Sequence, residues 1–446
     1  MKKVLKIVIS SVLMLFIFLW PLYVFVYRPA KIEELNTAKS EEWKGVIQLW
    51  DFPRVDSKTG SRYGWIQDKI RRFEKQNPGV YIEFVPLDWR KGPNKLEIAL
   101  KTGNLPDIAP VGTDYLYMDE SILEPLNEYF SKEEIKEFKY LAISAVTKNE
   151  KMWGVPFMMT TYSMFLNVEL FRERGVELPL DGNWTYEEFV EKMKALTWDA
   201  NGDGKLDYFG FISPIKPDFY NLWGIILSDG AEIVNDEGEY AFYGEKAISG
   251  LQKAVNLKQK YNVTPEEFGI YDENETWNLF FNQKRVAVFP TGSWAAKTLS
   301  DKYQSGEGFE YMVANYPIGD RRLPISLNNS VSAYGIFKQQ DKGKLDMCVK
   351  FLKFITRDDY QKELERLGVF PVKSTIEDIY INDSNMKKIE DCLSYTIPLP
   401  KHKEWNEIDR ILQNQIRLAI LGEKTAEEAI EEARRQVMLL NDRNDK

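Results

Sequence analysis

Between residues 46 and 111, three strand-like segments alternate with two helical patterns, and this alternation constrains the fold more than any other feature. The strands are GVIQLWDF, centred on Val46–Trp50, then VYIEFVPL and PDIAPVG. Apolar residues between 65 and 73 recur at helical spacing, and Leu96–Leu100 forms a shorter helical pattern that ends at Gly103. Strands and helices in this order predict an α/β fold, with a parallel sheet covered by helices.

The rest of the chain continues to mix strands and helices without an internal repeat. At 446 residues, two or three lobes are expected rather than one small core. Gly422 should end one of the last helices. A hydroxyl residue three positions before a glutamate predicts a capping box at three helix starts, which are Ser131/Glu134, Thr185/Glu188 and Thr425/Glu428.

Composition excludes several classes of function. The net charge of −9 argues against a nucleic-acid partner, because nothing would neutralise phosphates broadly. His402 is the single histidine, which removes most His-dependent chemistry, such as His-based triads, general bases and zinc sites built on imidazole. The two cysteines, Cys348 and Cys392, match no metal spacing, and Cys348 is expected to be buried in a helix.

The N-terminus predicts export from the cytoplasm. Lys2, Lys3 and Lys6 lead into an apolar run, Ile7–Val26, which is long enough to cross a bilayer as a helix. The bulky, charged sequence YVFVYRPAK that follows lacks a small-residue cleavage site. These features favour an uncleaved membrane anchor over a removed signal peptide, and both alternatives stay open. We expect an extracytoplasmic protein, anchored to the cell membrane or secreted.

The stretch RVAVFPTGSWAAKTL raises a question about Trp294. A buried strand ends at Pro290, and a turn then delivers Trp294 to the start of a predicted helix. Such a large apolar side chain either packs under its own helix or stays accessible to bind a flat apolar ligand face.

Four segments together resemble one family, the extracellular solute-binding proteins of ABC sugar importers, of the maltose-binding type. The likeness runs from about Val46 to Leu440. In chain order the four segments are LPDIAPVGTDYLYMDESILEPLNEY, WGVPFMMTTYSMFLNVELFRERGVELPLDGNWTYEEF, FFNQKRVAVFPTGSW and KFLKFITRDDYQKELERLGVFPV.

The resemblance implies a type II periplasmic-binding-protein-like fold, in which ligand lies in a cleft between two hinge-linked lobes. Crossings between the lobes would fall near Met158–Tyr162, Ser330–Gly335 and Val369–Ser374. The implied organisation is an N-terminal anchor or signal segment (1–28), a tether (29–44), lobe 1 (45–158 and 335–372) and lobe 2 (163–330 and 375–446).

The resemblance also places candidate ligand-binding residues. Sugars offer apolar C–H faces and a rim of hydroxyls, so their sites need flat aromatic rings together with carboxylates and amides. Tyr220, Trp294 and Trp405 would supply the rings from lobe 2. Polar groups and crossing residues would be Asp51, Asp114, Thr160, Tyr162 and Asn329. Thr160 and Val111 replace an acidic residue and an aromatic residue of the maltose binders, which puts a maltose-like preference in doubt.

The loop DANGDGKLD carries most of a calcium-binding pattern. Its oxygen donors would be the side chains of Asp199, Asn201, Asp203 and Asp207 with the backbone carbonyl of Lys205. The acid expected at the twelfth position is missing, since Gly210 stands there. The loop is either a structural Ca²⁺ site or an acidic, turn-rich connection; no catalytic cofactor is expected.

Three functional hypotheses follow. The first is a monomeric, non-enzymatic binding protein that takes up a carbohydrate and delivers it to the permease subunits of an ABC transporter. The second is a secreted glycoside hydrolase, which would need two facing carboxylates that the sequence does not reveal. The third is a sugar-sensing protein that signals to a membrane receptor.

Overall fold

The computed structural model describes residues 43–111, 118–235, 237–328 and 330–444, together with residues 14, 19–21 and 23 nearer the N-terminus. Within these residues, no helix combines the length and the apolar character needed to span a membrane. The predicted anchor or signal segment and the tether lie largely outside the described residues. Both stay predictions.

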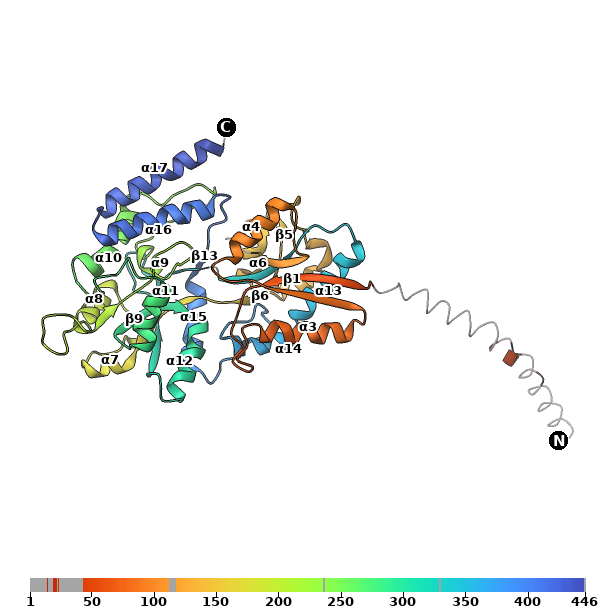
Figure 1. The fold of residues 1–446 in the computed structure, drawn as a ribbon, viewed down its shortest axis with the longest axis horizontal. Coiled ribbons are helices and arrows are strands. Elements are labelled where there is room, and N and C mark those ends of the chain that lie inside the picture. Colours follow the sequence, from red (N-terminus) through yellow and green to blue (C-terminus); the bar gives the residue numbers. More distant parts are fainter. Residues whose placement is uncertain are drawn as a thin grey trace.

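A five-stranded mixed sheet forms the centre of lobe 1, on the right of Figure 1. Its first three strands run parallel, as the alternation predicts, whereas β12 runs antiparallel to both of its neighbours. The strands are buried on both faces near their centres, so Leu49 and Ile108 have no exposed surface. In spatial order they are β2 (Val80–Pro86), β1 (Gly45–Asp51), β3 (Ile108–Val111), β12 (Val331–Ile336) and β6 (Val155–Met159).

Helices cover this sheet. Helices α3 and α13 pack on each other, and α13 also packs on β1, β6 and β12, while α6 packs on β6 and β12. Cys348 is buried within α13, as predicted. The helices of lobe 1 are α3 (Gly64–Gln76), α4 (Gly92–Thr102), α5 (Lys132–Lys136), α6 (Tyr140–Val146), α13 (Lys342–Ile355) and α14 (Asp358–Lys362), and a short ladder joins β4 (Thr147–Lys148) to β5 (Lys151–Met152).

A four-stranded sheet forms the centre of lobe 2. Its strands in spatial order are β10 (Tyr311–Ala314), β7 (Tyr162–Asn167), β9 (Val286–Gly292) and β8 (Phe209–Phe211). The long C-terminal helices α16 and α17 pack on each other and on α10, and Figure 1 shows them along the top of this lobe. The helices are α7 (Val168–Glu173), α8 (Tyr186–Ala195), α9 (Trp223–Ile226), α10 (Glu245–Gln259), α11 (Glu273–Trp277), α12 (Trp294–Gln304), α15 (Ser384–Cys392), α16 (Trp405–Leu421) and α17 (Ala426–Asn444).

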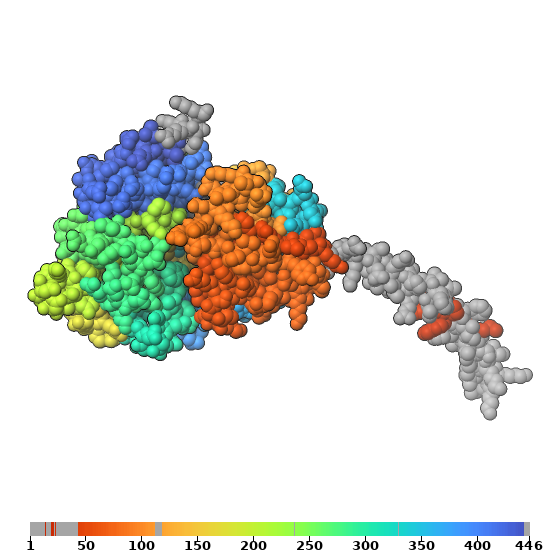
Figure 2. Space-filling model, in the orientation of Figure 1, coloured from red at the N-terminus to blue at the C-terminus, as the bar shows by residue number. Residues whose placement is uncertain are grey.

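The chain passes between the two sheets three times. It leaves lobe 1 between β6 and β7 and returns between β11 (Ser326–Asn328) and β12. The third passage lies between Lys373, which bridges Phe138 of lobe 1, and α15, which packs on β7 and β10. Strand β11 pairs in parallel with β13 (Thr396–Pro398), and this two-stranded sheet adjoins the passages. Figure 2 shows the two lobes side by side and in contact.

Local signals in the sequence account for the predicted helix ends. Both hydrogen bonds of the capping box are present at each of the three predicted starts. Gly103 and Gly422 end their helices in left-handed conformation, with φ of 72° and 79°, which glycine adopts without strain. The apolar run that precedes Phe171 shows no helical period in the sequence, yet the chain turns helical at Val168, because the Asn167 side chain caps the N–H groups of Glu169 and Leu170.

Candidate functional site

Strand register brings the ends of several strands to one edge of each sheet. In lobe 1, β3 and β6 both run antiparallel to β12, so their carboxyl ends lie beside the start of β12. Strands β1 and β2 are parallel to β3 and end at the same edge. In lobe 2, β9 ends where β7 begins, with Gly292 opposite Tyr162, and β8 runs parallel to β9. We call these two facing ends the crossing edge, since the chain passes between the sheets there.

Two predicted residues, Thr160 and Tyr162, lie on the passage itself. The hydroxyl of Thr160 lies 2.9 Å from that of Ser293, at the end of β9, and its N–H donates to the Ser330 carbonyl at 2.9 Å. Tyr162 is half-buried, and burial together with the nearby charge of Asp218 raises the pKa of its hydroxyl. Tyr162 therefore stays a neutral hydrogen-bonding group at physiological pH.

Trp294 opens α12 at the crossing edge and is half exposed. Its ring lies 5.6 Å from that of Trp277, and its edge lies over Gly292, where an added Cβ would come within 2.4 Å of the indole nitrogen. The indole therefore packs against the end of β9 rather than beneath α12. This placement leaves a large part of the side chain accessible, as a ligand-stacking role requires.

Tyr220 and Trp405 are brought together but are both buried. Their ring centroids lie 6.2 Å apart, and the Trp405 indole N–H donates to the Tyr220 hydroxyl at 3.3 Å. Neither ring offers open surface in this conformation, since Tyr220 is 3% exposed and Trp405 is 0% exposed. The structure places this pair next to β9, because the neighbouring Asn221 side chain donates to the Pro290 carbonyl at 2.7 Å.

Asp218 is a candidate ligand residue that the sequence argument missed. It follows β8 at the crossing edge, is solvent-exposed, and adopts a left-handed φ of 68°, which is unusual for a residue other than glycine. Its N–H donates to the buried carboxylate of Asp409 at 2.8 Å. The surrounding protein partly removes water from the Asp218 carboxyl, and this desolvation raises its pKa. The nearby positive charge of Lys216 partly offsets the shift. No local sequence signal marks it, because its conformation depends on a contact with α16.

Helix α16 fixes the segment that carries Asp218. Trp405, Asp409 and Gln413 recur every four residues, which places them on one face of the helix. The Gln413 amide donates to the Phe219 carbonyl at 2.9 Å and to Asp409 at 3.3 Å. Burial raises the pKa of Asp409 to about 7, although hydrogen bonds from the Asp218 N–H and the side chains of Gln413 and Tyr220 oppose this shift.

The other predicted ligand residues have different surroundings. Asp51 ends β1 at the crossing edge but is 2% exposed, and the Arg54 guanidinium lies 2.9 Å from both of its carboxylate oxygens. In this conformation Asp51 orients Arg54 rather than facing solvent. Asp114 and Asn329 lie outside the described residues, so their predicted roles stay predictions.

The predicted calcium loop is exposed and bonded to its own backbone. Asp199 accepts from the N–H groups of Gly202 and Gly204 at 2.7 Å each, which lowers the pKa of its carboxyl. The side chains of Asn201 and Asp203 make equivalent turns two residues on, and Asp207 accepts from the Ala200 N–H. In the part of the chain that the structure describes, no three His, Cys, Asp or Glu side chains are gathered to hold a metal ion. Calcium binding stays a prediction.

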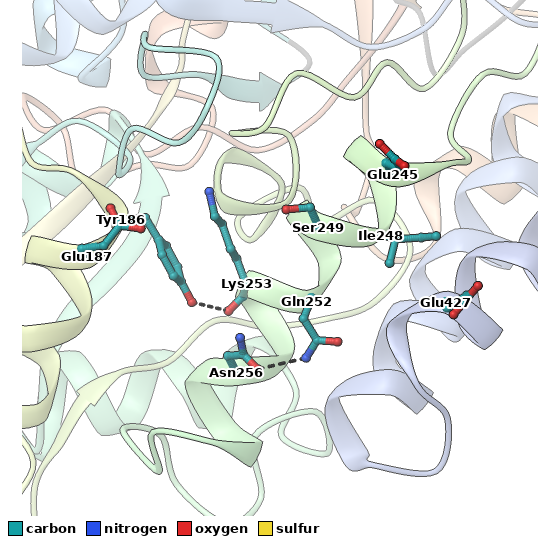
Figure 3. Close-up of a pocket in the computed structure, with 9 residues that line it drawn as sticks. All are labelled: Tyr186, Glu187, Glu245, Ile248, Ser249, Gln252, Lys253, Asn256 and Glu427. Carbon is teal, nitrogen blue, oxygen red and sulfur yellow. Dashed lines mark hydrogen bonds between the residues drawn. The ribbon is translucent and has the colours of Figure 1, made fainter.

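A separate groove of about 470 Å³ lies on lobe 2 between α8, α10 and the start of α17 (Figure 3). Two hydrogen bonds join groups of its lining: the Tyr186 hydroxyl donates to the Lys253 carbonyl at 2.7 Å, and Gln252 donates to Asn256 at 2.9 Å. None of the predicted ligand residues lines it. We therefore place the candidate site at the crossing edge.

Comparisons with known proteins agree with this architecture. The chain is similar to a putative binding protein of Brucella abortus, with 25% identity over 84% of this chain and 89% of that protein. It is also similar to the galactooligosaccharide-binding protein of Bacillus subtilis, with 22% identity over 90% of each chain, and to the maltotriose-binding protein of Pyrococcus abyssi, with 24% identity over 66% of this chain and 60% of that protein.

Solved structures share the fold. An ABC substrate-binding protein of Listeria monocytogenes, in complex with cycloalternan, superposes with a TM-score of 0.74 at 20% identity, over 89% of this chain and 98% of that one. The maltose/maltodextrin-binding domain MalE of Bdellovibrio bacteriovorus, bound to maltotriose, gives a TM-score of 0.72 at 20% identity, over 88% and 100%. The family model for bacterial extracellular solute-binding proteins matches residues 69–388. With its two sheets joined at the crossing edge, the chain belongs to the family of bacterial extracellular solute-binding proteins.

Proposed function

We propose that this protein captures a sugar or oligosaccharide between its two lobes and delivers it to the permease subunits of an ABC transporter. One observation carries the proposal: the half-exposed Trp294, the exposed carboxylate of Asp218 and the hydroxyl of Tyr162 all lie at the crossing edge of lobe 2. The relatives support a carbohydrate ligand, since two are named for maltotriose and galactooligosaccharide and two solved neighbours hold cycloalternan and maltotriose.

These groups match the two kinds of surface on a sugar. The Trp294 indole would stack on the C–H face of a pyranose ring. Asp218 would accept hydrogen bonds from ring hydroxyls, and Tyr162 can both donate and accept. Bonds to a carboxylate are stronger than neutral ones, so Asp218 would fix the orientation of the sugar. Binding of this kind needs no metal, cofactor or chemical step.

Closure of the lobes would follow from ligand contacts on both sides of the crossing edge. A ligand that touches both lobes binds the closed form better and therefore shifts the equilibrium toward it. We place lobe 1 at residues 45–158 and 331–372, because β12 belongs to its sheet, and lobe 2 at residues 163–328 and 375–446. The passages between the lobes act as the hinge. In the closed form, a monomer would present both lobe surfaces to the permease outside the cytoplasm, where the N-terminal segment would anchor or export it.

A thermal-shift screen tests the proposal. Purified protein is titrated with monosaccharides and with maltotriose, galacto-oligosaccharides and cyclic glucans, and at least one of them should raise the melting temperature. At a ligand concentration of 100 times Kd the stabilisation is about 2.7 kcal/mol. The sugar should be recovered intact by chromatography afterwards. Absence of a shift with every saccharide, or steady turnover of the one that binds, would count against a sugar-binding, non-enzymatic role.

A further inference from the structure

Trp89 is a second exposed tryptophan at the crossing edge, on lobe 1. It lies three residues beyond the end of β2 and is 57% exposed. Among residues 43–111, 118–235, 237–328 and 330–444, only Trp89 and Trp294 are exposed tryptophans. The two belong to different lobes, and both follow strands that end at the crossing edge.

The Trp89 ring is held in one orientation. It stacks on the buried ring of Phe52, with centroids 4.3 Å apart and planes within 9° of parallel. Its indole N–H donates to the Pro53 carbonyl at 3.1 Å. The Arg54 guanidinium lies 5.9 Å from the ring centre and is itself held by Asp51. One face of the indole is thus backed by protein, while more than half of the side chain stays in solvent.

This arrangement suits a stacking ligand. A ring that is fixed before binding loses little conformational freedom when a ligand packs on it, so more of the contact energy appears as affinity. The flat apolar face fits the C–H face of a sugar ring, and the nearby carboxylate of Asp51 is already bonded to Arg54.

We propose that Trp89, backed by Phe52, is a second sugar-stacking platform that binds a different sugar unit from the one that Trp294 contacts. The inference rests on the proposed sugar-binding function and deepens it, because it assigns the ligand class as oligosaccharides that reach from one lobe to the other. A monosaccharide would use one platform only.

Trp89→Leu is the informative variant, since leucine still covers Phe52 but lacks a flat face, while Trp89→Phe keeps the flat face. By calorimetry with the oligosaccharide that binds wild-type protein most tightly, Trp89→Leu should raise Kd about tenfold or more, the scale of losing an aromatic anchor. Trp89→Phe should raise it far less. Tyr81→Ala is the matched control and should leave Kd unchanged, because Tyr81 is 63% exposed but lies at the start of β2, away from the end that leads to Trp89.

A footprinting measurement on the wild-type protein tests the same contact without a variant that could misfold. Hydroxyl-radical labelling of Trp89, read by mass spectrometry, should fall when the bound oligosaccharide is added. If Trp89→Leu binds the oligosaccharide with wild-type affinity, or if Trp89 labelling is unchanged on binding, Trp89 is not a stacking platform. The proposed sugar-binding function would still hold in that case. If wild-type protein binds no saccharide, the proposed function fails, and the platform fails with it.

Discussion

The indole N–H of Trp405 donates to the hydroxyl of Tyr220, and Tyr220 in turn hydrogen-bonds the buried carboxyl of Asp409. Asp409 also accepts from the N–H of Asp218 at 2.8 Å. A chain of contacts therefore runs from the first turn of α16 to the residue that we expect to bind sugar hydroxyls. In this conformation, Trp405 and Tyr220 help to position Asp218 through Asp409 and do not themselves offer a ring for ligand stacking.

Asp409 makes stability depend on pH. Burial raises the pKa of the Asp409 carboxyl from an ordinary value near 4 to about 7. The neutral carboxyl therefore contributes its full stabilisation of the fold below about pH 4, and this stabilisation is lost as pH rises through about 7. Each unit of raised pKa corresponds to about 1.4 kcal/mol of lost stability. Asp409→Asn keeps an acceptor for the Asp218 N–H without the charge. Urea unfolding at pH 5 and pH 8 should show the wild type losing more stability than the variant; equal losses would contradict this.

Trp294→Ala should weaken sugar binding by about 1–3 kcal/mol, the range for truncating an aromatic anchor. Folding should change little, because the side chain is half exposed. Tyr303→Ala provides the control, since Tyr303 lies on the same helix and is equally exposed. Calorimetry on both variants checks the prediction, and an affinity unchanged by Trp294→Ala would return this residue to a packing role.

Gly292→Ala should weaken binding without removing any ligand-contacting group. The new methyl group would meet the Trp294 indole at 2.4 Å and push the ring out of place. In a Trp294→Ala background the same change should have no further effect, because there is no ring to displace. A double-mutant cycle measured by calorimetry separates the two cases, and additive effects would show that Gly292 acts independently of Trp294.

Chelation tests the loop around Asp199. If the loop holds calcium, EDTA should lower the melting temperature of the wild type, and excess Ca²⁺ should restore it. Asp199→Asn should make the melting temperature insensitive to EDTA, because it removes the negative charge of the carboxylate at the first position of the pattern. A melting temperature insensitive to EDTA, with no metal found by native mass spectrometry, would leave a turn-rich loop held by its own backbone bonds.

Short-range signals made much of the fold predictable. The alternating strands and helices of residues 46–111 gave the parallel part of the lobe 1 sheet, and each capping box marked its helix start correctly. The turn before Trp294 likewise predicted the start of α12. The start of α7 was missed, since one capping asparagine, Asn167, lies inside an apolar run that has no helical period.

The candidate site was predictable only in part, because several of its contacts join residues far apart in the sequence. Asp218 owes its position to Asp409, 191 residues later, and Trp89 stacks on Phe52 across a whole helix and strand. The pairing of Asp51 with Arg54 is local, yet the residue types alone do not show whether that carboxylate faces ligand or arginine. The burial of Trp405 depends on how α16 packs beside the Tyr220 segment.

Closure of the two lobes around a sugar can be measured by small-angle X-ray scattering, with and without the oligosaccharide that stabilises the protein most. Saturating ligand should reduce the radius of gyration as the two lobes close, and the same sugar should cause no reduction in a Trp294→Ala, Asp218→Ala double variant. Identical scattering curves with and without a sugar whose binding calorimetry confirms would contradict closure around the ligand.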